Sequence, residues 1–186
     1  MGFGTSIACD ISMNTRLTAE ERKLYQDVET IRDLLHRART VAMVGLSDKK
    51  ERASNFVGSY LKSEGYKIIP VNPNLPEVLG ERSYPDLKSI PASSAGQAGT
   101  VDIVDIFRRP DEIMTIVEQA IEIKAKAIWM QLLIVNRDAA KLAKDNGLIV
   151  IMDKCMKIEH GRYIGTLHWA GMNTEIVTAK KAGRFI

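Results

Sequence analysis

Residues 40–74 constrain the fold of this chain more than any other segment. An apolar run over 41–44 leads into Gly45 and a polar loop. A helical pattern follows the loop, and a second apolar run covers 66–71. This order of strand, loop, helix and strand is typical of the opening unit of a nucleotide-binding α/β domain. The loop lacks the three-glycine pattern G-x-G-x-x-G, however, because Gly45 stands alone and basic residues follow it.

The same alternation continues to residue 152. We expect strands over 41–46, 66–71, 101–107, 127–131 and 148–152, and helices over 53–64, 110–123 and 137–146. The strands are nearly continuously apolar, as strands covered on both faces are. The sequence therefore predicts an α/β fold, a doubly wound parallel sheet of the Rossmann-like type, in a single domain.

The segments around this core are less regular. Thr18, with Glu21 three residues later, predicts a capping box, and apolar residues at helical spacing up to Leu35 predict one N-terminal helix. Residues 1–16 are expected to form a flexible tail ahead of a domain over 17–186. We expect residues 75–100 to be irregular, and 161–186 to form a short polar extension with a helix near 174–181.

Composition excludes several functions. The chain has 186 residues, is 45% hydrophobic and carries a net charge of +3, which is too small to indicate nucleic-acid binding. No apolar stretch approaches the ~20 residues of a membrane helix. Two cysteines, Cys9 and Cys155, do not make a disulfide framework, so we expect a reducing, cytoplasmic location.

The residues that follow each strand are the candidates for a site, because ligands of such sheets bind beyond the carboxyl ends of the strands. Gly45 allows close approach to a phosphate, Ser47 adds a hydroxyl, and the next helix offers free N–H groups. Further basic side chains suit phosphate contacts, although a solvated charged loop is the alternative for any one of them. These basic residues are Lys49, Lys50, Arg52, Arg108 and Arg109.

The second strand argues against a nicotinamide cofactor. An acidic residue usually ends this strand and holds the ribose hydroxyls, but Asn72 stands here. No Walker-type loop, no catalytic triad and no cluster with metal-ligand spacing occurs in the sequence. NADP remains open, because the basic residues suit its extra phosphate.

Cys155 follows the fifth strand, between Lys154 and Lys157. Positive charge there favours the thiolate, and a buried, inert thiol is the alternative. Asp102 and Asp105, in the third strand, are interpreted as structural residues.

Several motifs together resemble the stand-alone CoA-binding domain proteins, which are similar to the N-terminal domain of the succinyl-CoA synthetase α-subunit. The resemblance covers roughly residues 31–180. It is carried by VAMVGLS (41–47), IPVNPN (69–74), VDIVDIFRR (101–109), WMQL (129–132), MDKCMKIEH (152–160) and GMNT (171–174). Two departures stand out: Leu133 replaces the glycine that usually follows Gln-Leu, and the proline usual near Ala53 is absent.

The resemblance implies coenzyme A as the ligand and a set of residues that bind it. The phosphate end would contact Gly45, Ser47, Lys49 and Arg52. The adenine or ribose would lie near Asn72 and Pro73, with Phe107 and Arg108 along the opposite lip, and Gln131 and Cys155 would line the thiol side. Leu46 and Ser54 are also expected to belong to the CoA site. The synthetase's ligase chemistry is not expected, because the chain shows neither the phosphohistidine domain nor the partner subunit.

We therefore expect a non-catalytic protein that binds CoA or an acyl-CoA, as a carrier or sensor. An NAD(P)-linked oxidoreductase and a subunit of an acyl-CoA-transforming complex are the alternatives. A homo-oligomer or an acyl-CoA enzyme as partner is left open. A sharper hypothesis is that Cys155 forms a mixed disulfide with the CoA thiol.

Overall fold

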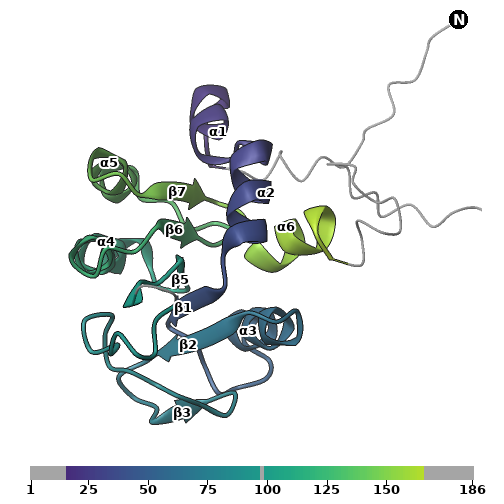
Figure 1. Ribbon diagram of the computed structural model, residues 1–186. Helices are drawn as coiled ribbons and strands as arrows, with labels where there is room; N and C mark the ends of the chain where they lie inside the picture. The colour runs from purple at the N-terminus through teal and green to yellow at the C-terminus, as the bar shows by residue number, and fades with distance from the viewer. Residues whose placement is uncertain (1–15, 97–98, 166–186) are drawn as a thin grey trace, which may run out of the picture.

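A five-stranded, wholly parallel sheet forms the centre of the protein (Figure 1). The computed structural model describes residues 16–96 and 99–165. The strands are β1 (Thr40–Val44), β2 (Lys67–Val71), β5 (Ile103–Ile106), β6 (Ala127–Met130) and β7 (Ile149–Met152). Their order in the sheet is β2-β1-β5-β6-β7, which confirms the predicted Rossmann-like α/β fold.

The chain reverses its direction of winding between β1 and β5. Val44, the last residue of β1, pairs with Val71 on one side and with Ile106 on the other. The chain leaves β1 toward β2 at one edge and later returns beside β1 to build the rest of the sheet. The helices that follow β1 and β5 therefore lie on opposite faces of the sheet, and such a switch point is where doubly wound sheets bind ligands.

Helices cover both faces of the sheet, as the continuously apolar strands predict (Figure 1). One face packs against α2 (Val28–Arg37), α3 (Ala53–Ser63) and α6 (Met156–Tyr163), and the other against α4 (Ile113–Glu122) and α5 (Arg137–Asp145). Because side chains alternate along a strand, Met43, Ile103 and Trp129 are buried on the first face. Val104 and Ile128 are buried on the second.

The N-terminal region forms two helices and not the one that was expected. The Thr18–Glu21 capping box is present, but α1 (Ala19–Tyr25) ends at Gln26 and α2 begins after Asp27. Asp27 breaks the pattern because its carboxylate accepts a hydrogen bond from Thr30 N and caps the second helix. Leu24, expected on the buried face, is half exposed.

Two further elements were not predicted. Residues expected to be irregular include a short hairpin, β3 (Glu77–Val78) and β4 (Glu81–Arg82), whose turn residues Leu79 and Gly80 both have positive φ. Two-residue strands carry too little alternation to be recognised in a sequence. Helix α6 was also missed, because its buried side includes charged residues that only tertiary partners can satisfy. A 3₁₀ turn, η3 (Pro110–Glu112), precedes α4.

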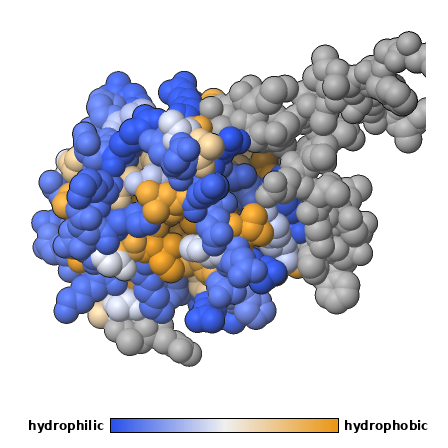
Figure 2. Space-filling model, turned by 90° about the horizontal axis from the view of Figure 1, so that it is seen from above, coloured by the Kyte–Doolittle hydropathy of each residue, from blue (hydrophilic) through white to orange (hydrophobic). Residues whose placement is uncertain are grey.

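Some expectations concern parts of the chain that the structure does not describe. The tail over 1–15 and the helix near 174–181 lie outside the described residues. In the described part, no helix is both long and apolar enough to span a bilayer. The face seen in Figure 2 is mostly hydrophilic with a hydrophobic area near its middle, and exposed apolar surface of this kind is normal for a folded domain.

Candidate functional site

Gly45 lies at the switch point and has no room for a side chain. Its φ is +86°, and a Cβ built on it would lie 2.8 Å from both the Phe107 carbonyl oxygen and Arg108 Cδ. The backbone is fixed here, since Gly45 N donates to Val71 O and Phe107 N donates to Val44 O, both at 2.9 Å. The loops after β1 and β5 therefore pass each other so closely that only glycine fits.

The loop after β1 is held by a small network around Ser47. Ser47 N donates to Ser54 Oγ at 3.1 Å, and Asn55 Nδ2 donates to Ser47 O at 2.8 Å. Ser47 Oγ in turn accepts from Lys49 N. Ser54 and Asn55 are buried at the start of α3, so the helix itself shapes the loop. Sequence reasoning missed Asn55, whose role depends on a contact made eight residues back along the chain.

The N-terminus of α3 has no side-chain cap. Arg52 occupies the N-cap position without a side-chain hydrogen bond, and the first turn holds no acidic residue. Lys49 and Arg52 are exposed beside it. Uncapped N–H groups, the positive end of the helix dipole and two cations together form a setting that attracts anions.

Asn72 holds the backbone and does not face open space. Its Nδ2 donates to Leu46 O at 2.9 Å, and its Oδ1 accepts from Asn74 N at 3.0 Å. Both polar atoms of this side chain are therefore occupied by protein. The Leu46 side chain is fully buried in the core, so only the backbone of Leu46 is placed near a ligand.

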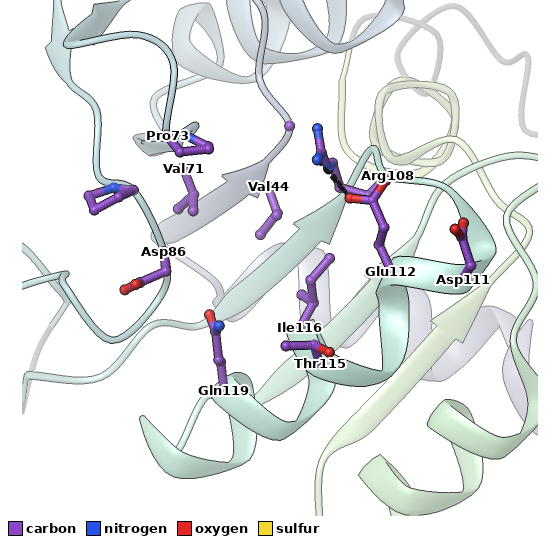
Figure 3. A pocket seen from close by; sticks show the side chains of 12 residues that line it. Val44, Val71, Pro73, Asp86, Arg108, Asp111, Glu112, Thr115, Ile116 and Gln119 are labelled. Atoms are coloured by element: carbon purple, nitrogen blue, oxygen red, sulfur yellow. Dashed lines mark hydrogen bonds and ion pairs between the residues drawn. The ribbon is translucent and has the colours of Figure 1, made fainter.

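A pocket of about 420 Å³ opens beside Gly45, on the α4 side of the sheet (Figure 3). We call it the Arg108 pocket. Val44, Gly45, Val71, Pro73, Pro85, Asp86, Arg108, Asp111, Glu112, Thr115, Ile116 and Gln119 line it. Its volume is in the usual range for small-molecule sites. Three of the predicted site residues, Gly45, Pro73 and Arg108, meet here.

Carboxylates share the pocket with Arg108. The Arg108 guanidinium lies 2.6 Å from Glu112 Oε2, one helical turn away. Asp86 Oδ1 accepts from Ser89 N and Ser89 Oγ, and these bonds lower the pKa of Asp86 below its usual range. The pocket wall is therefore rich in acceptors that suit hydroxyl and amino groups, and Arg108 is already paired.

The remaining predicted residues gather on the α3 and α6 side of the sheet. Gln131 Nε2 donates to Asp105 Oδ1 at 2.8 Å, and Trp129 Nε1 donates to Lys154 O at 2.7 Å, one residue before Cys155. Cys155 packs against the core on this face and is the N-cap of α6. We call Asp105, Trp129, Gln131 and Cys155 the Cys155 cluster.

The two lysines beside Cys155 do not activate its thiol as expected. Lys154 Nζ lies 3.7 Å from Glu159 Oε1, and Lys157 Nζ lies 3.4 Å from the centre of the Phe56 ring. Burial raises the pKa of the Cys155 thiol, and the charges of Asp105 and Glu159 raise it further. Of the two alternatives for Cys155, a buried thiol with a raised pKa agrees with these surroundings, and a thiolate stabilised by the neighbouring lysines does not.

Asp105 was interpreted as structural, and its surroundings differ from those of Asp102. Asp102 Oδ2 accepts from Arg39 N, Thr40 N and Thr40 Oγ1, and its other oxygen pairs with Lys126 Nζ at 2.7 Å. Asp105 is fully buried with Gln131 as the partner of Oδ1, and burial raises its pKa to about 7. The sequence signal for this difference was the position of Asp105 inside the apolar strand β5, whereas Asp102 precedes that strand.

The backbone conformation of Leu133, which replaces the glycine usual in the family, accounts for one departure from the family pattern. Its φ is +65°, a left-handed conformation that glycine adopts without strain. Leu133 N donates to Asp153 Oδ1 at 2.6 Å, and Asp153 itself has φ +59°. Leucine keeps the turn that the usual glycine would make, and its side chain is half exposed.

Seven of the predicted residues thus fall into three groups along one edge of the sheet. Gly45, Pro73 and Arg108 meet in the Arg108 pocket, Lys49 and Arg52 flank the start of α3 outside it, and Gln131 and Cys155 belong to the Cys155 cluster. No group of His, Cys, Asp and Glu side chains within the described residues is arranged to hold a metal ion.

Comparisons with known proteins agree with this fold. The family model for a CoA binding domain matches residues 39–161. The uncharacterized protein YneT of Bacillus subtilis is 38% identical over 130 residues, which cover 70% of this chain and 91% of YneT. A hypothetical protein from Pyrococcus horikoshii is 42% identical with a TM-score of 0.68, covering 74% of this chain and 92% of that chain. A Thermus thermophilus protein is 27% identical with a TM-score of 0.67, over 74% and 99% of the two chains.

Proposed function

Because the chain belongs to the CoA-binding domain family, we propose that it binds coenzyme A, or an acyl-CoA, across the switch point of its sheet. The observation that carries the proposal is the Arg108 pocket, which opens beside Gly45 at the switch point, where the loops after β1 and β5 pass each other. In doubly wound sheets, the crevice at the switch point is where nucleotides bind.

In this proposal the ligand extends over all three groups of residues. The adenosine lies in the Arg108 pocket, whose carboxylates accept hydrogen bonds from ribose hydroxyls and the adenine amino group. The phosphates lie at the uncapped start of α3, near Ser47, Lys49 and Arg52. The pantetheine arm then runs past Phe107 toward Gln131 and Cys155, which places the thiol beside the Cys155 cluster.

The proposed role is binding without catalysis, as a carrier or sensor. The described residues bring together no nucleophile–base pair with hydrogen-bond contact at the switch point, and the paired charges of the Arg108 pocket position a ligand more readily than they transform it. Comparing CoA with acetyl-CoA distinguishes whether the protein binds the free thiol or the acylated form.

Binding is tested by thermal unfolding in the presence of CoA, acetyl-CoA, NAD and NADP, with reductant present so that no disulfide forms. A ligand that binds only the folded state raises the Tm by an amount that grows with its concentration. We expect CoA or acetyl-CoA to raise the Tm and Gly45→Ala to abolish this increase.

A nicotinamide nucleotide is the second candidate, and Asp86 is the observation that favours it. Asp86 is an ionised carboxylate in the Arg108 pocket and is able to hold a ribose diol in place of the acid missing at Asn72. A rise in Tm with NAD or NADP but not with CoA would replace the proposal by an oxidoreductase-type site.

A further inference from the structure

Asp105 carries the one buried side-chain oxygen or nitrogen that has no hydrogen-bond partner in the described part of the chain. This atom is Oδ2, while Oδ1 accepts from Gln131 Nε2. Buried polar atoms are nearly always paired, and an exception in a central strand needs an explanation. Burial of an acid that keeps one oxygen unpaired is unfavourable, so a purely structural role is better served by an apolar residue at this position.

Asp105 and Cys155 lie on the same face of the sheet and are connected through Trp129. Asp105 lies opposite Trp129 in the β5–β6 register, and the Trp129 indole reaches the carbonyl of Lys154, directly before Cys155. Both the carboxyl group and the thiol lie on the face covered by α3 and α6. The charge of Asp105 also adds to the effect of burial in raising the pKa of the Cys155 thiol.

The other ionisable groups near this space are already paired. Strands β1 and β6, on either side of β5, contain no ionisable side chain. On α6, Glu159 is bound by Arg162 at 3.0 Å and lies 3.7 Å from Lys154. On α3, Tyr60 is hydrogen-bonded to His160 of α6 at 3.0 Å. Asp105 is therefore the carboxyl group on this face that is left with a free oxygen.

We propose that Asp105 accepts the proton of the Cys155 thiol when Cys155 exchanges with a disulfide of the CoA class. The Cys155 Sγ–H proton passes to Asp105 Oδ2 as Sγ forms a bond with one sulfur of the ligand disulfide. The disulfide's own S–S bond breaks, and its second sulfur leaves as a thiolate that takes the proton from Asp105. Cys155 is oxidised, the ligand disulfide is reduced, and no other oxidant is needed.

In the proposed step the Cys155 thiol turns toward Asp105 Oδ2, while Gln131 holds the carboxyl group through Oδ1. Cys155 is partly exposed, so a disulfide in solution has access to it, whereas Asp105 is fully buried. The choice of CoA as the ligand class rests on the proposed function, but the proton transfer does not.

Two roles of Asp105 predict opposite effects of one substitution. If Asp105 acts on Cys155 only through its charge, Asp105→Asn lowers the thiol pKa and speeds the reaction. If Asp105 is the proton acceptor, the same isosteric change slows the reaction, because general bases contribute roughly 10²–10⁴-fold. The sign of the rate change therefore separates the two roles.

The experiment measures the reaction of Cys155 with 4,4′-dithiodipyridine, a small disulfide that does not need the nucleotide site. It is done in a Cys9→Ser background, which removes the other cysteine of the sequence. We expect the wild-type rate to rise in a first step up to about pH 7, as Asp105 ionises, and again at higher pH as the thiol itself ionises. We expect Asp105→Asn to lack the first step and to react at least tenfold more slowly at pH 7. A faster or unchanged rate overturns the proposal. So does a wild-type profile without the inflection near pH 7, which needs no variant that must fold.

A second arm tests the ligand class by intact-mass measurement after incubation with CoA disulfide. We expect an adduct of one CoA on the wild type, slower adduct formation in Asp105→Asn and none in Cys155→Ser. Reduced CoA should raise the Tm of wild type and Asp105→Asn equally, because binding precedes the exchange. If CoA fails to raise the Tm of the wild type, the proposed function fails, while the small-disulfide rates still decide the role of Asp105.

Discussion

The Arg108 pocket and the Cys155 cluster lie at the same edge of the sheet but differ in how their charged groups are exposed and paired. In the pocket, Arg108 and Glu112 are charged, partly exposed and paired with each other. In the cluster, Asp105 is fully buried and half of its carboxyl group is unpaired. Paired, exposed charges contribute little to stability and are free to exchange partners, whereas a buried acid ties protonation to folding.

This difference assigns separate tasks to the two regions. A ligand that enters the pocket has to compete with an existing ion pair, so affinity depends on salt and on the strength of that pair. A group that reaches the cluster meets a carboxyl whose protonation changes near neutral pH. We therefore expect substitutions in the pocket to change binding and substitutions in the cluster to change pH dependence.

The largest effect is expected at Gly45, which separates the two regions. Gly45→Ala forces a side chain into a φ of +86° and to within 2.8 Å of Phe107 O, and should lower the free energy of unfolding by about 3 kcal/mol. The matched control is Gly65→Ala, where φ is +92° but no atom lies within 4 Å, so only the cost of about 1 kcal/mol for the conformation remains. Urea unfolding measures both. An equal loss of unfolding free energy in both variants would show that the loops at the switch point shift to accommodate the new side chain at little cost.

The second prediction concerns the buried acid of the cluster. The pKa of Asp105 is raised from 3.8 to about 7 on folding, so the folded state binds more protons than the unfolded state between these values. Stability from this group is therefore complete below pH 4 and falls by up to about 1.4 kcal/mol per pH unit until about pH 7. Asp105→Asn removes this dependence, so its stability relative to the wild type should increase by about 2 kcal/mol between pH 5 and pH 7. Urea unfolding at both pH values gives the comparison, and a constant difference would show that Asp105 stays ionised in the fold.

The third prediction tests the pocket. Arg108→Gln should weaken CoA binding about tenfold, which corresponds to about 1.4 kcal/mol, because a cation beside the bound nucleotide is lost. Arg109→Gln is the matched control: Arg109 is adjacent in sequence and also pairs with Glu112, but it does not line the pocket. Calorimetric titration at low salt should give a dissociation constant within twofold of the wild type for the control. Equal weakening by both changes would indicate general charge attraction and no contact at Arg108.

Much of the fold could be predicted from the sequence, because parallel strands covered on both faces are continuously apolar. The strand ends and helix stops followed from this pattern, and Gly65 and Gly147, which follow α3 and α5, have the positive φ expected of helix ends. The break between α1 and α2 was missed because it depends on Asp27 capping the second helix, against the apolar spacing that continues through it.

The candidate site was less predictable, because its properties depend on partners distant in sequence. Lys154 and Lys157 stand beside Cys155 in the sequence, yet their charges are directed to Glu159 and to the Phe56 ring. The orphan oxygen of Asp105 likewise follows from packing between strands and α6. The Arg108–Glu112 pair was not predicted either, although four residues at a helix start is a recognised spacing for an ion pair.

That ion pair gives the last and smallest prediction. If the ion pair with Glu112 competes with the ligand for Arg108, then Glu112→Gln should free the guanidinium. CoA binding should become about threefold stronger at low salt, with little change in stability. The gain should shrink at high salt, where the pair is already screened. Asp111→Asn is a suitable control, because Asp111 lines the same pocket but is 3.4 Å from Arg109 instead. A stronger gain from Asp111→Asn would mean that the pocket repels the ligand by its total charge, and that the pairing of Arg108 with Glu112 does not limit affinity.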